Sequence, residues 1–170
     1  MFTAVSSDDP SGGVLYLHSD DESDSTSLMV NECTFDSCEA TGTTSVRHGG
    51  GAIYIDCGSL SIISSVFLIC KSSFYGGSVL AVNNCKSSSI SYCTFIDCHA
   101  HFGGGLMTYK GPTSSIFSSR FLFCSVNFAG GGIYHDSENQ SRDFTLSDSL
   151  FVGNYATFDG QRGGGAFEDH

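Results

Sequence analysis

The chain has 170 residues, of which 40% are hydrophobic, and its 14 Phe and 7 Tyr are enough to fill the core of one domain. Its formal net charge is −11 with only seven Lys and Arg, so it has few groups with which to neutralise phosphates. This excludes nucleic acid and anionic membrane surfaces as expected partners, and favours a protein, a glycan or a cation.

The N-terminal stretch MFTAVSSDDPSGG has neither the basic region nor the apolar segment of a secretion signal. No run of 18 apolar residues occurs anywhere, so direct membrane insertion is not expected. From these residues alone the chain is either cytoplasmic or a piece of a longer, processed protein.

The first glycine pair, in GGVLYLH from Gly12, precedes a short apolar run, and the acidic stretch HSDDESDS from His18 to Ser25 follows it. Such a stretch can hold calcium, but it lacks the glycine and the distal glutamate of an EF-hand loop. We expect a solvated loop between structural repeats here, and no bound cofactor or metal.

A short motif, F-x-x-C, then recurs along the chain. Its copies are CTFDSC (33–38), SVFLIC (65–70), CTFIDC (93–98), SRFLFC (119–124) and SLFVGN (149–154), the last with asparagine in the cysteine position. Glycines and apolar residues follow each copy, as GGGAIYI from Gly49, GGSVLAV from Gly76, GGGLMTY from Gly103, GGGIYHD from Gly130 and GGGAFED from Gly163. The phenylalanines are about 26 to 32 residues apart, a period typical of solenoids.

The segments between the glycines, such as SLSIISSVFLIC and SSSISYCTFIDC, alternate small or polar residues with Ile, Val, Phe and Tyr. This alternation predicts two or three short strands in each repeat, joined by turns. Repeats that close on themselves and stack at about 4.8 Å form a parallel β-helix, here of about five to six coils. The fold class is therefore all-β, with residues 1–170 as a single domain and glycine at the tight corners.

Equivalent residues of successive coils should lie above one another. We therefore expect an interior ladder with one aromatic and one mainly thiol column: Phe35, Phe67, Phe95, Phe121 and Phe151, beside Cys38, Cys70, Cys98, Cys124 and Asn154. Cysteines at the coil spacing are further apart than a relaxed disulfide requires, so these are predicted to be buried thiols. Zinc is disfavoured, because C-x4-C on an extended chain does not direct both sulfurs to one point.

The pairing of F-x-x-C or F-x-x-N with a downstream G-G-[AGS]-[AILV] resembles the repeats of the chlamydial polymorphic outer-membrane proteins and similar β-helix proteins of protists. The likeness extends from Gly12 to the end of the chain, although cysteine replaces the usual asparagine in four copies of five. It implies a right-handed β-helix on a cell surface or secreted, acting in adhesion. We therefore expect a non-catalytic interaction module, a part of a longer repeat protein, with a protein or glycan ligand.

The alternative is a carbohydrate-active enzyme, since pectate lyases and polygalacturonases share this architecture. Those enzymes gather carboxylates on one sheet face. Here the position before the motif cysteine reads Ser37, Ile69, Asp97, Phe123 and Gly153, and Asp36 belongs to a different column, so no carboxylates stack. His99 and His101 could bind a metal with Asp97, but we expect a surface turn. The last glycine copy stops inside its strand, and this predicts end-to-end self-association through an uncovered coil.

Overall fold

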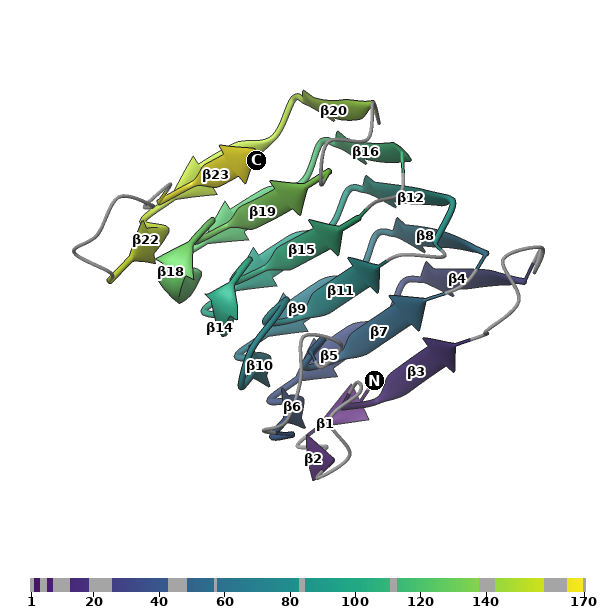
Figure 1. Ribbon diagram of the computed structural model, residues 1–170, viewed down its shortest axis with the longest axis horizontal. Helices are drawn as coiled ribbons and strands as arrows, with labels where there is room; N and C mark the ends of the chain where they lie inside the picture. Colours follow the sequence, from purple (N-terminus) through teal and green to yellow (C-terminus); the bar gives the residue numbers. More distant parts are fainter. Residues whose placement is uncertain are drawn as a thin grey trace.

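The computed structural model describes residues 2–3, 6–7, 13–18, 26–42, 49–56, 58–82, 85–110, 113–137, 143–157 and 165–169. Every regular element among these residues is a β-strand, and all strand pairs are parallel. The strands stack in successive coils from the N-terminus to the C-terminus (Figure 1). The predicted right-handed parallel β-helix is confirmed. None of the described residues forms a helix that could cross a bilayer.

Each coil has four strands rather than two or three, and each strand pairs with its equivalents in the coils before and after. Two of the four faces, sheets A and B, each contain six strands among the described residues. Sheet A consists of β1 (Phe2–Thr3), β5 (Thr34–Asp36), β9 (Val66–Leu68), β13 (Thr94–Ile96), β17 (Arg120–Leu122) and β21 (Leu150–Val152). Sheet B consists of β2 (Ser6–Ser7), β6 (Glu39–Ala40), β10 (Lys71–Ser72), β14 (His99–Phe102), β18 (Ser125–Ala129) and β22 (Tyr155–Ala156).

The other two faces, sheets C and D, contain six and five described strands. Sheet C consists of β3 (Leu15–His18), β7 (Ile53–Asp56), β11 (Val79–Val82), β15 (Leu106–Tyr109), β19 (Ile133–Asp136) and β23 (Phe167–Asp169). Sheet D consists of β4 (Ser27–Asn31), β8 (Ser59–Ile63), β12 (Ser87–Ser91), β16 (Thr113–Phe117) and β20 (Phe144–Ser147). The described strands thus pass each face five or six times.

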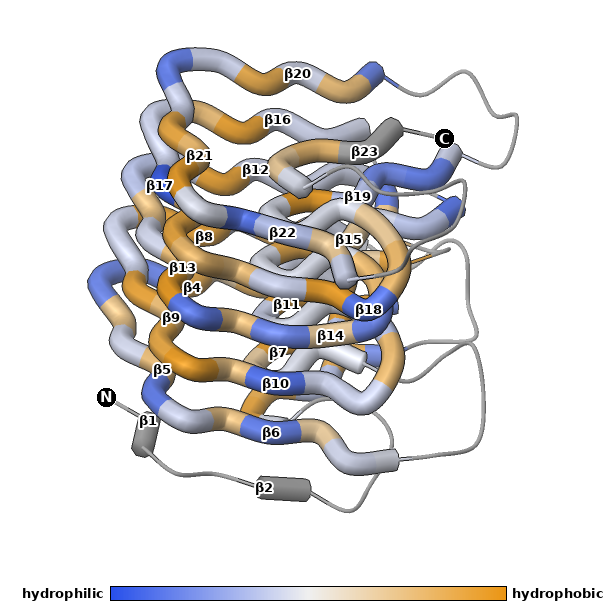
Figure 2. The backbone as a smooth tube through the Cα atoms, turned by 90° about the vertical axis from the view of Figure 1, so that its left-hand side faces the viewer, coloured by the Kyte–Doolittle hydropathy of each residue, from blue (hydrophilic) through white to orange (hydrophobic). Residues whose placement is uncertain are grey.

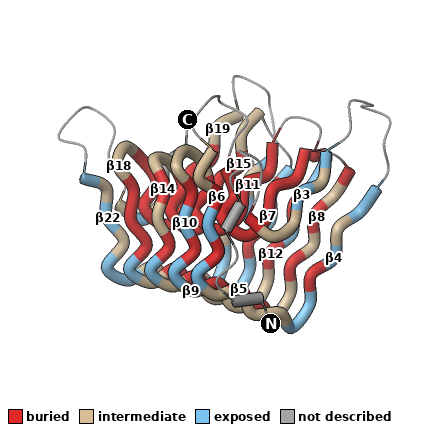
Figure 3. Tube along the Cα trace, turned by 90° about the horizontal axis from the view of Figure 1, so that it is seen from below, coloured by how far each residue is buried: buried red, intermediate tan, exposed pale blue. Residues whose placement is uncertain are grey.

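The core follows from the alternation of the strands. In β12 and β16 serine or threonine alternates with a buried residue, so that Ile90 and Ile116 point inward. The central strands of sheet C are buried on both faces: in β7, Ile53 and Ile55 join the interior while Tyr54 joins a second apolar cluster outside it. Buried residues recur at equivalent places in successive coils, and exposed ones gather at the bends (Figure 3).

The phenylalanines form one interior column. Phe35, Phe67, Phe95 and Phe121 are fully buried, and Phe151 in the last coil is partly buried. Successive ring centroids are 4.9, 4.8, 4.6 and 5.0 Å apart, with planes within 7° of parallel. The rings therefore repeat at the spacing of the β-strands.

The cysteine column lies beside it. Cys38, Cys70, Cys98 and Cys124 are buried, and the last three donate to the carbonyl of the motif phenylalanine one coil earlier, each at 3.7 Å. Asn154 makes the equivalent bond, from Nδ2 to the Phe121 carbonyl at 2.8 Å, and its Oδ1 accepts from the Cys124 backbone N–H at 2.9 Å. The cysteine thiol therefore donates the same hydrogen bond as the Asn154 side-chain N–H, to the phenylalanine carbonyl one coil earlier.

Reactivity of the cysteines follows from this burial. None of the seven described cysteines is in a disulfide, and burial raises the pKa of Cys93 to about 11 and that of Cys98 further. Because only the thiolate reacts, alkylation of Cys93 in the native protein at pH 8 should be roughly a hundredfold slower than in the denatured chain, and that of Cys98 slower still. The partly exposed Cys33 should react first. Peptide mass spectrometry after timed labelling measures this, and native Cys98 labelling as fast as Cys33 would contradict it.

The glycines fulfil two separate requirements at the turn from sheet B to sheet C. The first glycine of a cluster, such as Gly76 or Gly103, has a positive φ of 56° or 61°, as predicted for a tight corner. The second glycine of a cluster, such as Gly77, does not have a positive φ. A Cβ on Gly77 would instead lie 2.0 Å from the Gly104 carbonyl oxygen of the next coil. The second glycine is therefore required by the close approach of successive coils.

Two other corners are formed mainly by residues other than glycine, contrary to the expectation. Single residues with φ between 46° and 57° turn the chain from sheet D to A and, except at Gly153, from A to B. The first set is Glu32, Ser64, Tyr92, Ser118 and Asp148, and the second is Ser37, Ile69, Asp97 and Phe123. We call the second set, together with Gly153, the corner column.

Candidate functional site

The outer face of sheet A carries an aliphatic stripe. Leu68, Ile96, Leu122 and Val152 occupy one register position in four successive coils, with Asp36 before them. All four are partly or fully exposed, since their strand neighbours point into the core. Val66 and Leu150 add to the face from the next outward position, and hydrophobic segments recur along these strands in Figure 2. A row of partly exposed apolar side chains on one sheet face is a candidate interaction site.

The corner column borders this stripe and continues its register. The backbone N–H groups of Ile69, Asp97 and Phe123 donate to the carbonyls of Ile96, Leu122 and Val152 at 2.9, 2.9 and 2.8 Å. Ile69 is 43% exposed and Phe123 is 55% exposed. Two large apolar side chains therefore extend the stripe beyond the edge of the sheet.

Charge around the stripe is mainly acidic. Five acidic residues lie on sheet A or at its two borders, Glu32, Asp36, Glu39, Asp97 and Asp148, against the basic Lys71 and Arg120. Arg120 lies in strand β17 and is exposed. The surface thus combines an apolar centre with a negative border.

A second surface is aromatic and lies where sheet B turns toward sheet C. Phe102 stacks on Phe128 with ring centroids 5.2 Å apart and is 5.6 Å from Tyr75. His101 contacts Phe74 and Phe128 edge to face at 5.3 and 5.5 Å. These rings are partly buried, and they cover the outer apolar cluster of sheet C. Their main role is therefore packing.

The two histidines of this region are in strand β14, not in the surface turn that we expected. A shift in the pairing of β14 with β18 occurs between Ala100 and Phe102. His99 Nδ1 lies 2.9 Å from the Ser125 hydroxyl, and burial, together with the nearby His101, lowers the pKa of His99. Burial likewise lowers the pKa of His101, so both rings favour the neutral form at pH 7.

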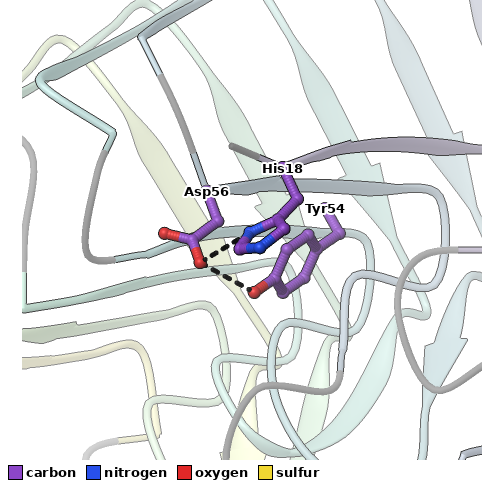
Figure 4. A network of polar contacts seen from close by, with 3 residues as sticks. All are labelled: His18, Tyr54 and Asp56. Atoms are coloured by element: carbon purple, nitrogen blue, oxygen red, sulfur yellow. Dashed lines mark hydrogen bonds and ion pairs between the residues drawn. The ribbon is translucent and has the colours of Figure 1, made fainter. Parts of the chain in front are cut away.

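A polar network at the end of β3 and β7 was not found from the sequence. Asp56 is buried, and its Oδ2 lies 3.2 Å from His18 Nδ1 and accepts from the Tyr54 hydroxyl at 3.4 Å (Figure 4). His18 is therefore part of a strand, while residues 19–25 of the expected acidic loop lie outside the described residues. With one carboxyl group held by two neighbours, the network supplies hydrogen-bond partners to a buried polar side chain.

The structure brings no catalytic carboxylate pair together among the residues it describes. Asp36 lies in β5 on the face of sheet A, whereas Asp97 lies at the corner two coils later. The described His, Cys, Asp and Glu residues contain no group of three that could hold a metal ion. The ladder residues are interior, so they build the coils, and the candidate site is the outer face of sheet A with its corner column.

Comparison with known proteins gives no assignment. No protein-family model matches the chain, and neither curated proteins nor solved structures match it significantly. The likeness of its motifs to the polymorphic outer-membrane proteins stays a prediction. The function is therefore argued from the surface of the molecule itself.

Proposed function

We propose that the chain is a non-catalytic interaction module of the adhesin-like β-helix type, which binds another protein through the outer face of sheet A. One observation carries this proposal: Ile69 and Phe123 are exposed apolar residues in the left-handed region, with φ of 53° and 57°. Asparagine, aspartate or glycine tolerates this conformation far better than a β-branched or aromatic residue.

The same corner shows what the fold alone requires. Its other members are Ser37, Asp97 and Gly153, all small or polar. A left-handed conformation costs an L-residue about 1 to 2 kcal/mol, and leaving a large apolar side chain exposed regains little of it. The ring of Phe123 lies over Gly153 of the next coil, but Ile69 and Phe123 both stay exposed, and backbone strain at exposed positions is typical of functional sites. Binding to a partner supplies a reason for large apolar side chains at two corners beside an aliphatic stripe.

This reasoning predicts that stability and binding respond differently at the corner. Changing Ile69→Asn or Phe123→Asn should alter the free energy of unfolding by less than about 1 kcal/mol, because relief of backbone strain offsets the lost packing. Capture of a protein partner should fall about tenfold, as expected for an anchoring side chain. Denaturant unfolding measures the first effect. Quantitative mass spectrometry of proteins retained by the immobilised chain, from cells that produce it, measures the second.

Ser37→Asn is the matched control, because Ser37 has the same backbone conformation, with φ of 54°, but lies outside the apolar part of the corner. It should leave both stability and capture unchanged. The proposal is wrong if the same proteins are retained by the parent and by both corner variants. Cleavage of a polysaccharide by the purified chain would favour the carbohydrate-active alternative.

A further inference from the structure

Asp97 interrupts the apolar part of the corner column. Ile69 lies one coil before it and Phe123 one coil after it, with the ladder hydrogen bonds continuing through all three residues. Successive coils are about 4.8 Å apart, so Asp97 lies between Ile69 and Phe123 in the column, and the ring of Phe123 also lies against Gly153 of the following coil. Ile96, its neighbour along the chain, belongs to the stripe. A charge is thus fixed inside the surface that we propose for binding, not at its edge.

The Asp97 side chain is available to a partner. It is exposed, and no described residue forms an ion pair with it. Lys71 in the preceding coil is itself exposed and pairs in register with His99 rather than with Asp97, and the His99 ring, which Asp97 influences electrostatically, favours its neutral form. Covering the apolar surface without neutralising Asp97 would leave a buried charge, and this is strongly unfavourable. A partner that covers Ile69 and Phe123 is therefore favoured if it supplies a cation to Asp97.

We propose that Asp97 is the specificity residue of this face and binds an arginine side chain of a protein partner. This inference rests on the proposed function. A guanidinium can bond the carboxylate through two N–H groups, whereas an ammonium presents a single point charge. Its stem can pack on Ile69, and its plane can lie against the ring of Phe123. The arrangement of one carboxylate between an aliphatic and an aromatic side chain matches all three parts of arginine.

The charge of the chain favours a different protein over a second copy. Each copy has a net charge of −11, and five acidic residues around the face oppose two basic ones. Two such faces would repel each other, while a basic partner would be attracted. The one described arginine, Arg120, lies on the same face, so reciprocal pairing with Asp97 of a second copy is an outcome that the test must distinguish.

The test uses two peptides, Ser-Leu-Ser-Arg-Ser-Leu-Ser and the same peptide with citrulline in place of arginine. In an extended peptide the two Leu side chains and the central one share a face. Citrulline keeps the shape and removes the charge. The full chain, isotopically labelled, is titrated by NMR, which detects affinities on the order of 1 mM. We expect the arginine peptide to bind the parent about fivefold more tightly than the citrulline peptide.

The substitution in the protein and the change from arginine to citrulline in the peptide together form a double-mutant cycle. Asp97→Asn should abolish the preference for arginine without unfolding, because asparagine tolerates the left-handed conformation. Asp148→Asn is the control, since Asp148 is an exposed acid with φ of 50° at the other corner, and it should keep the full preference. Equal binding of the two peptides to the parent, loss of the preference in both variants, or no peptide binding would each overturn the inference about arginine.

Two outcomes separate this inference from the proposed function. If Ile69→Asn and Phe123→Asn lose the captured partner while Asp97→Asn retains it, the face binds a protein and the arginine assignment is wrong. If the parent sediments as a dimer that Asp97→Asn and Arg120→Gln each dissociate, the carboxylate is occupied by a second copy. That result would also overturn the inference.

Discussion

Replacing Phe95 with alanine should lower the free energy of unfolding by about 4 kcal/mol, because it removes a large side chain from the middle of the core. Phe95 is fully buried and stacks on Phe67 and on Phe121, at centroid distances of 4.8 and 4.6 Å. A gap at this level removes contacts from three successive coils. Since each coil is stabilised mainly by its neighbours, the loss should also reduce the cooperativity of unfolding.

Guanidinium-induced unfolding, followed by circular dichroism, measures this change. Phe117→Ala is the matched control, because Phe117 is 37% exposed on the outer side of sheet D and should cost less than about 1 kcal/mol. Equal losses at Phe95 and Phe117 would show that the interior column does not stabilise the solenoid.

Replacing Gly77 with alanine should be almost as damaging, lowering the free energy of unfolding by about 3 kcal/mol. The added Cβ would meet the Gly104 carbonyl oxygen at 2.0 Å and the backbone nitrogen and oxygen of His99 at 2.8 Å. These are backbone atoms of the next coil, which can move only if two coils separate. The parallel hydrogen bonds between them would then lengthen.

Gly165→Ala is the control, since Gly165 holds the equivalent place in the last described coil. Its added Cβ would meet a single atom closer than 3.0 Å, the Asn154 carbonyl oxygen at 2.9 Å. A loss below about 1 kcal/mol is expected there. If both alanines destabilise equally, the close approach of coils is not the cause.

The interior of this molecule could be predicted from its sequence because each coil repeats the same physical requirement. Phe95 and Cys98 recur with their equivalents at one period, and a residue that must fill the same space in every coil leaves a visible pattern. The glycine clusters are also visible in the sequence, and they predict the tight corner with positive φ at Gly76 but not the close contact between coils at Gly77. The reason for Gly77 depends on the distance between coils, which a sequence does not contain.

The corners could not be predicted for the opposite reason. Ser37, Ile69, Asp97 and Phe123 share one backbone conformation but no chemistry, so the column has no sequence signature. The statistical preference for glycine or asparagine at positive φ points away from Ile69 and Phe123. Similarly, the sequence predicts a surface turn where β14 lies, because His99 and His101 are polar residues beside glycines. Their neighbours in the adjacent coils, which partly cover them, are distant in the sequence.

The corner column has a consequence for how such a molecule could change its partner. Side chains there point away from the core, while the backbone bonds that hold each corner run between amides and carbonyls and are independent of side-chain identity. The corner residues lie about 4.8 Å apart, one in each coil. Substitutions at single corners could therefore change the binding specificity one coil at a time while leaving the interior unchanged. Binding specificity and folding would then vary independently of each other. Duplication of a coil would add one residue to the corner column without changing the backbone geometry of the corner.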